Sequence, residues 1–266
     1  MQQLKPSILP DRHVIRIAGN DAADLLQGVI TQDIALISSE SAILSALLTP
    51  QGKILFDFLM TRDDEGFLLD CHADHSSSLI KKLKMYKLRA QATIDFLDDW
   101  KITVGEDGLI DKRSEGLPKR SFSRGTDDTN LPQDRNAYDR VRIAHGIAEF
   151  GTDYAGEEMF PMDVNYDAIN GVSYQKGCFV GQEVVSRMKR KTDPRRRTYI
   201  IKSEGAAPGK GDIITAGEST LGNFLHCQDN MGLAVLRIDR LQKAQAENLA
   251  PVCNDATLQV TVPDYL

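Results

Sequence analysis

The chain has 266 residues, of which 41% are hydrophobic and 26% are charged, and its formal net charge is −6. Such a length allows one large domain or two modest ones, and the acidic balance argues against a general nucleic-acid coat, which needs clustered positive charge. We find no apolar run of about 18 residues for a membrane span and no signal-peptide pattern, so we expect a cytoplasmic protein without a membrane partner. Its four cysteines are far apart in sequence, which favours reduced thiols.

The first half of the chain alternates strand and helix signals. β-branched residues indicate strands, and apolar residues at helical spacing indicate helices. Three apolar runs separated by turn sequences predict an antiparallel meander at 42–48, 54–61 and 67–71. The other predicted elements are strands at 13–18, 92–96 and 100–104 and helices at 22–29 and 75–88.

The second half changes character twice. Residues 105–136 are rich in Gly, Asp, Arg and Pro, so we expect a long connection or insertion, followed by a helix at 138–145. After Pro194, short β-type runs are punctuated by Gly and Pro. These runs are 198–203, 212–215, 220–227, 231–238 and 257–262. The pattern predicts an α+β domain over residues 1–194 and a small β-barrel domain over residues 195–266.

The strongest local signal is the run Lys176-Gly177-Cys178-Phe179-Val180-Gly181-Gln182-Glu183. A strand, a glycine turn and a helix beginning near Val180 would place Cys178 just ahead of the first helical turn. Free N–H groups and the helix dipole favour a thiolate at that position, and Lys176 adds to the effect. The competing interpretation is a small, buried, structural cysteine. Nucleotide-binding glycine patterns are absent from the run.

A second candidate is Asp57, a carboxylate within an apolar strand sequence. Strand alternation places it on the same face as Leu55 and Leu59. Such a carboxylate is partly desolvated and needs a partner or a function. The alternative is a strand-edge carboxylate that faces solvent.

The run 176–183 closely resembles the signature of the YgfZ-type folate-binding proteins, relatives of the glycine-cleavage T-protein, an aminomethyltransferase. The resemblance covers most of the chain, including 25–34 and 231–237. It implies an α+β aminomethyltransferase-like folate-binding fold, with antiparallel sheets and helices, followed by a small C-terminal β-barrel. It also implies binding of tetrahydrofolate or a one-carbon derivative, and support of iron–sulfur cluster assembly or repair and thereby of tRNA modification. The expected partners are a reduced folate and iron–sulfur client or assembly proteins.

The resemblance also suggests roles for single residues. Asp57 occupies the place of a folate-facing aspartate, and Cys178 would supply a reactive sulfur near the bound cofactor, so these two are the catalytic candidates. Arg142 resembles an arginine on a helix that lines the folate site, although the glutamate of that helix is replaced around Ala144. The cofactor-binding candidates are Asp57, Arg142, Lys176, Gly177, Gln182 and Glu183.

Two other functions stay open at this point. Asp57 also suits a folate-dependent aminomethyl or methyl transferase, and the sequence does not decide whether the chain turns over a substrate. Seven of the eleven residues at 187–197 are basic. Such a run suits an RNA-binding module or a site that binds the anionic polyglutamyl tail of a folate. Direct tRNA contact is not favoured, because no aromatic residues are interleaved with this basic run.

Overall fold

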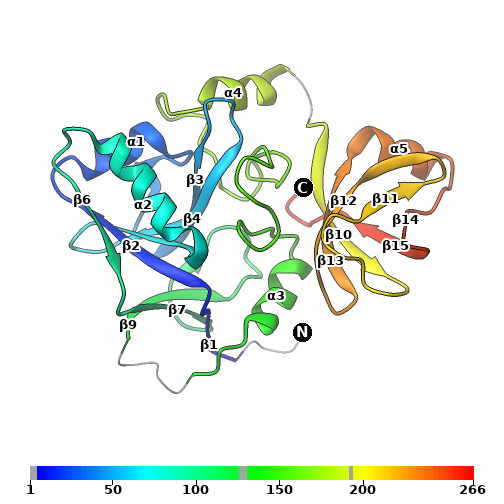
Figure 1. The fold of residues 1–266 in the computed structure, drawn as a ribbon, viewed down its shortest axis with the longest axis horizontal. Helices are drawn as coiled ribbons and strands as arrows, with labels where there is room; N and C mark the ends of the chain where they lie inside the picture. The colour runs from blue at the N-terminus through cyan, green and yellow to red at the C-terminus, as the bar shows by residue number, and fades with distance from the viewer. Residues whose placement is uncertain (1–4, 126–130, 192–193) are drawn as a thin grey trace.

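The computed structural model describes residues 5–125, 131–191 and 194–266. A larger body lies beside a smaller barrel (Figure 1). The strands of the body are β1 (Ser7–Ile8), β2 (Arg12–Ala18), β3 (Ser41–Leu48), β4 (Ile54–Arg62), β5 (Phe67–His72), β6 (Thr93–Leu97), β7 (Trp100–Gly105), β8 (Ile110–Asp111) and β9 (Lys119–Arg124). Its helices are α1 (Ala22–Val29), the short 3-10 helix η1 (Ile34–Leu36), α2 (Ala73–Lys87), α3 (Arg135–Ala144) and α4 (Gln182–Lys191).

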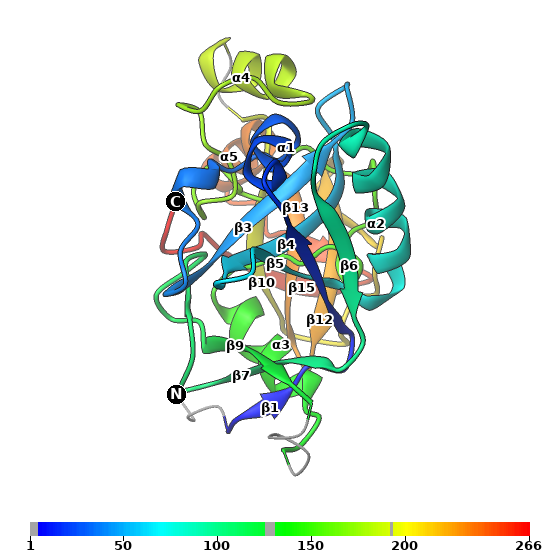
Figure 2. The ribbon, with the colours of Figure 1, turned by 90° about the vertical axis from the view of Figure 1, so that its left-hand side faces the viewer.

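The centre of the body is a six-stranded sheet in the order β6-β2-β5-β4-β3-β8. The predicted meander is confirmed, because β3, β4 and β5 pair as antiparallel neighbours. Helices α1 and α2 form where apolar residues recur at helical spacing, and they pack on this sheet (Figure 2). Leu26, Leu79 and Leu83 are buried in the same core as the sheet residues. None of the helices in the described residues is long and apolar enough to cross a membrane.

The expected irregular connection at 105–136 is wrong in part. It contains β8 and β9, and β9 pairs with β7 in a three-stranded sheet of order β1-β7-β9. The inward side chain of β9 is Arg120, which is fully buried and bonds to Asp70 and Tyr138. A strand that buries an arginine lacks the apolar alternation by which strands are predicted.

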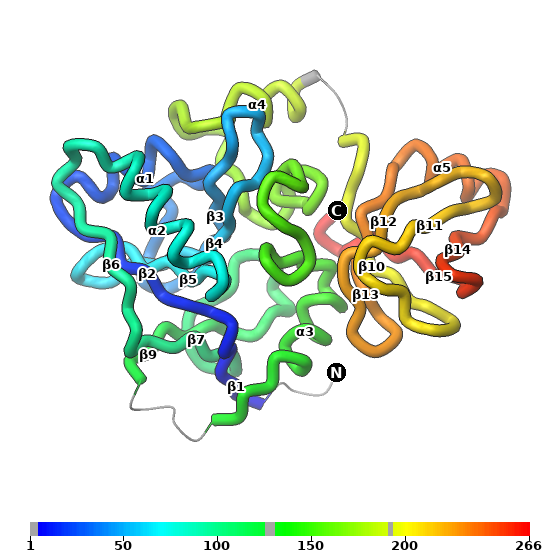
Figure 3. The backbone as a smooth tube through the Cα atoms, viewed as in Figure 1, coloured from blue at the N-terminus to red at the C-terminus, as the bar shows by residue number. Residues whose placement is uncertain are grey.

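The C-terminal region is a closed barrel in the order β10-β13-β12-β11-β14-β15. Its elements are β10 (Arg196–Ser203), β11 (Ile213–Ala216), β12 (Ser219–Gln228), β13 (Met231–Arg237), α5 (Ile238–Ala246), β14 (Val252–Cys253) and β15 (Ala256–Thr261). The predicted barrel is confirmed, whereas α5, which buries Leu241 and Ala244, was not predicted. Helix α3 of the body packs against β12 and β13 (Figure 3).

Candidate functional site

Asp57 lies on β4 in the interior of the body, where its side chain is held by two tyrosines. Its Oδ2 atom accepts a hydrogen bond of 2.9 Å from Tyr154 Oη and another from Tyr166 Oη. Burial raises the pKa of Asp57, while these hydrogen bonds and the charge of Arg12 act in the opposite direction. Asp57 is only 6% exposed. The predicted desolvated carboxylate is therefore confirmed, and the solvent-facing alternative is wrong.

The two tyrosines and Asp57 form a ring of oxygen atoms, since Tyr154 Oη also lies 2.8 Å from Tyr166 Oη. Burial and the neighbouring Asp57 raise the pKa of both tyrosines, so both keep their protons. Asp57 Oδ1 forms no hydrogen bond within the described part of the chain, so it is an acceptor that a ligand could use.

Arg142 on α3 is fully buried, and its guanidinium group is already bonded. Its Nη1 atom donates to Asp153 Oδ2 at 2.6 Å and to the Ile147 carbonyl at 3.0 Å, and Nη2 donates to Asp153 Oδ1 at 3.1 Å. The Nε atom donates to Asp139. Burial alone would lower the pKa of Arg142, but the surrounding carboxylates raise it overall. This corrects the expectation of a fork that faces the folate, because all three of its nitrogen atoms are used inside the protein.

Arg142 belongs to a buried ionic network that runs through the body. The network joins β2, β5, β9 and α3, so it fixes the position of Arg142 through several elements at once. Its arginines are Arg12, Arg113, Arg120, Arg135 and Arg142, and its acids are Asp70, Asp111, Asp139, Glu149 and Asp153. Asp11, which is partly exposed, also pairs with Arg135 at 2.8 Å, so five cations face six anions, and this near balance explains how so many charges can be buried.

The loop that carries Cys178 departs from its predicted structure. Residues 171–181 contain neither a strand nor a helix, and α4 begins at Gln182, so the expected strand and the helix start near Val180 are wrong. Gly181 has a φ of +82°, and a Cβ there would lie 2.6 Å from the Thr49 carbonyl oxygen. The helix therefore cannot begin before this close contact with the β3–β4 turn. Cys178 is an exposed free thiol, not a buried structural cysteine.

Lys176 anchors the same loop. Its Nζ atom donates to the carbonyl oxygens of Ile30 at 2.7 Å and Gln32 at 2.9 Å. Burial lowers the pKa of Lys176 to about 8. The ammonium group donates to these two carbonyls and forms no hydrogen bond with Cys178 among the described residues. The direct stabilisation of a Cys178 thiolate by Lys176, which the sequence suggested, is therefore not seen. The next residue, Gly177, is exposed and open to solvent.

The two catalytic candidates lie in different surroundings. The Cys178 loop packs against the turn at Gly52 through Gly181 and Val184. Asp57 follows five residues later on β4, roughly 15 Å away along an extended strand. Gln182 and Glu183 begin α4 and lie on the Cys178 side. The molecule thus has a buried carboxylate site and an exposed thiol site.

The basic run at 187–197 is partly neutralised. Arg196 pairs with Asp163 at 2.7 Å, and Arg197 forms a two-point pair with Asp167. The side chain of Lys191 lies outside the described residues. These pairs fasten the start of β10 to the body, so only part of the run is free for an anionic partner.

Comparison with known proteins shows which proteins this chain is similar to. Residues 195–266 match the family model "CAF17, C-terminal beta-barrel domain". The chain is similar to the iron–sulfur cluster assembly factor IBA57 homolog, mitochondrial, of Pyricularia oryzae, with 29% identity over 87% of this chain and 71% of that protein. The mouse IBA57 factor is 28% identical over 88% and 78% of the two chains. The human factor is 26% identical over 97% and 84%.

A solved structure extends the comparison to the fold. The glycine cleavage system aminomethyltransferase T from Bartonella henselae matches with a TM-score of 0.70 and 14% identity, covering 98% of this chain and 86% of that chain. The predicted aminomethyltransferase-like fold with a C-terminal barrel is therefore confirmed. The three IBA57 factors are named as mitochondrial proteins, which contradicts the expected cytoplasmic location.

Proposed function

We propose that this protein is an iron–sulfur cluster assembly factor of the YgfZ type that binds a reduced folate and presents the thiol of Cys178 to iron–sulfur chemistry. The observation that carries the proposal is the exposure of Cys178 on an anchored loop. Two of the other cysteines, Cys71 and Cys253, are buried, and Cys227 is half-buried. The similarity to named iron–sulfur assembly factors over 87–97% of the chain supports the same function.

Thiolates are the usual protein ligands of iron–sulfur clusters. Cys178 would provide one such ligand, and a cluster needs more. The described residues contain no group of three or more His, Cys, Asp and Glu side chains that could hold a metal ion. We therefore propose that a partner iron–sulfur protein supplies the remaining ligands, and that the cluster is cargo shared between the two proteins.

The folate part of the proposal rests on Asp57. The pterin ring of tetrahydrofolate, or of a one-carbon derivative, carries N–H groups. One of them would donate a hydrogen bond to Asp57 Oδ1, which has no other partner in the described residues. Arg142 does not fit a direct folate contact, because its donors are used by Asp139 and Asp153. In this proposal Arg142 supports the folate site indirectly, through the buried ionic network. Lys176 and Gly177 belong to the loop at 171–181 that carries Cys178, which we call the thiol loop, and Gln182 and Glu183 begin α4 directly after it; in this proposal all four shape the thiol site.

We also propose that the chain divides into a folate-binding region at 1–194 and the barrel at 195–266. The match to the barrel family begins at residue 195, and β10 begins at Arg196. An effect on tRNA modification would follow from tRNA-modifying enzymes that need iron–sulfur clusters. Contact between this chain and tRNA is not required for that effect.

Two experiments test the parts separately. Tetrahydrofolate is titrated into the wild type, Asp57→Ala and Cys178→Ser, and we expect binding to be lost in the Asp57 variant alone, because alanine removes the Oδ1 acceptor. Cells that lack the protein are then complemented with each form, and the activity of a cluster-dependent enzyme is measured. We expect Cys178→Ser to fail and the matched control Cys227→Ser to succeed. Equal rescue by Cys178→Ser would remove the thiol from the proposal.

A second candidate is a folate-dependent aminomethyl or methyl transferase. The observation that favours it is the buried Asp57, whose raised pKa suits a group that exchanges a proton. Transfer of a one-carbon unit to tetrahydrofolate from an aminomethyl donor is measured in the wild type and Asp57→Asn. Turnover that depends on Asp57 and is indifferent to Cys178→Ser would favour this enzyme over the assembly factor.

A further inference from the structure

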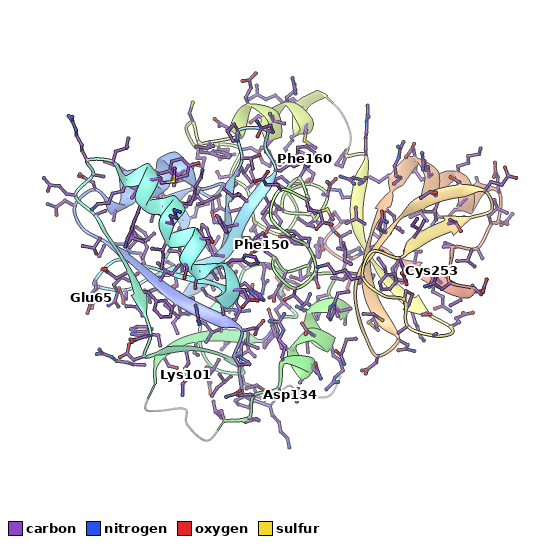
Figure 4. All side chains as sticks on the ribbon, viewed as in Figure 1. Glu65, Lys101, Asp134, Phe150, Phe160 and Cys253 are labelled. Carbon is purple, nitrogen blue, oxygen red and sulfur yellow. The ribbon has the colours of Figure 1, made fainter. Side chains whose placement is uncertain are left out.

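A cavity of about 510 Å³ lies between the barrel and the body. The body contributes the loop that follows α3, and the barrel contributes β12, β13, α5 and the loop before β11. In Figure 4 the labelled Phe160 lies on the side of the body that is next to the barrel. Its lining includes Asp153, Glu158, Met159, Lys210, Leu221, Val235 and Arg240.

Two cations that line this cavity lack a carboxylate partner. Lys210 Nζ donates to the Thr152 carbonyl oxygen at 3.1 Å, and Arg240 Nη1 donates to the Thr220 carbonyl oxygen at 2.5 Å. Neither side chain forms an ion pair with a described residue. Each of them keeps further N–H donors after its carbonyl bond. The cavity thus holds two positive charges that form no ion pair with a carboxylate of the described residues.

The acids that line the cavity do not cancel these charges. Asp153 is occupied by the two-point pair with Arg142. Glu158 is exposed, and its Oε2 atom accepts a hydrogen bond from the backbone of Ala155. Lys210 and Arg240 set against Glu158 leave an excess of positive charge.

Apolar side chains complete the lining. Leu221 and Val235 from the barrel and Met159 from the body lie around the cavity. A volume of about 510 Å³ falls within the range of small-molecule sites, roughly 300–1,000 Å³. We propose that the cavity binds a small organic anion, whose carboxylate or phosphate groups contact Lys210 and Arg240 and whose body contacts the apolar lining.

This anion site is distinct from the site proposed for the pterin ring. Tyr154 and Asp153 are neighbours in one loop, yet the Tyr154 hydroxyl bonds to Asp57 while Asp153 lines the cavity. Neither Asp57 nor Cys178 lines it. A ligand here touches the barrel and the body together, so its binding stabilises their arrangement.

The test uses the full chain and two probes, citrate for carboxylates and pyrophosphate for phosphates. Each is titrated at low ionic strength into the wild type, Lys210→Gln, Arg240→Gln and the double variant, and binding is measured by calorimetry. We expect the wild type to bind one probe more tightly than the other, which identifies whether the site prefers carboxylate or phosphate groups. Each glutamine should raise the Kd about tenfold, as expected for one charge-assisted hydrogen bond.

Two further variants make the outcome specific. Lys243→Gln on α5 removes an exposed cation that pairs with Glu247 and does not line the cavity, and it should leave the Kd unchanged. Glu158→Gln removes the opposing charge and should tighten binding by about threefold. Absence of binding of both probes to the wild type, or an unchanged Kd in the double variant, would overturn the site.

Discussion

The Nζ atom of Lys176 lies 2.7 Å from the carbonyl oxygen of Ile30, the residue that caps the C-terminal end of α1. The ends of helices expose carbonyl groups, and a cation there interacts favourably with the helix dipole. Lys176 therefore fastens one side of the thiol loop to α1. Gly181 fastens the other side through its contact with Thr49. Cys178 lies between the two anchors, exposed but held in place.

Lys176 should give the protein a distinctive dependence on pH. Its pKa is lowered from 10.5 to about 8, so between these values the unfolded chain binds more protons at this position than the folded protein. The folded state should then gain stability as the pH rises through this window, by at most about 1.4 kcal/mol per pH unit. Urea unfolding of the wild type and Lys176→Met at pH 7 to 10 checks this. Parallel stability profiles for the two proteins would contradict it.

Gly181→Ala should destabilise the thiol loop. The new Cβ would lie 2.6 Å from the Thr49 carbonyl oxygen, at a φ of +82° that side chains rarely adopt. We expect a loss of about 1–3 kcal/mol and faster labelling of Cys178 by a thiol reagent. Gly177→Ala is the matched control, because a Cβ at Gly177 has no atom within 4 Å. Equal effects of the two substitutions would show that the close contact does not hold the loop.

The fold could be predicted wherever the buried side chains are apolar. The helix at α1 follows the expected helical periodicity, and the strands β3 and β4 coincide with the expected apolar runs; their apolar residues form the core. Strand β9 could not be predicted, because the side chain that it buries most completely is Arg120. Its partners Asp70 and Tyr138 lie far away in sequence, and a single sequence gives no signal for such pairing.

The candidate site could be predicted only in part. Asp57 stands out as a lone carboxylate in an apolar strand, and its burial follows from the apolar run, because residues 56–61 of β4 are all buried. Tyr154 and Tyr166, which hold it, lie in an irregular segment without periodicity. The family resemblance suggests that Arg142 contacts the ligand. Its pairing with Asp153 depends on tertiary structure, which the sequence does not show.

The four thiols should differ sharply in reactivity. Cys178 is exposed, whereas burial raises the pKa of Cys71 to about 12 and also raises those of Cys227 and Cys253. The thiolate is the reactive form, so a disulfide reagent at pH 8 should modify one cysteine rapidly in the native protein. The rapid phase should disappear in Cys178→Ser and persist in Cys227→Ser. Rapid modification of Cys178→Ser would show that another thiol is accessible.

Arg142→Met should destabilise the whole body. The substitution leaves Asp153 and Asp139 buried without their cation, and breaking a buried ion pair in this way costs about 3–5 kcal/mol. The neighbouring Arg140→Met is the matched control, because Arg140 is half exposed and lies 3.6 Å from Asp229 at the surface. We expect the control to cost less than about 1 kcal/mol. Urea unfolding measures both, and tetrahydrofolate titration of the folded variants separates the two roles of Arg142. A variant that stays stable but loses folate affinity would restore Arg142 as a direct ligand.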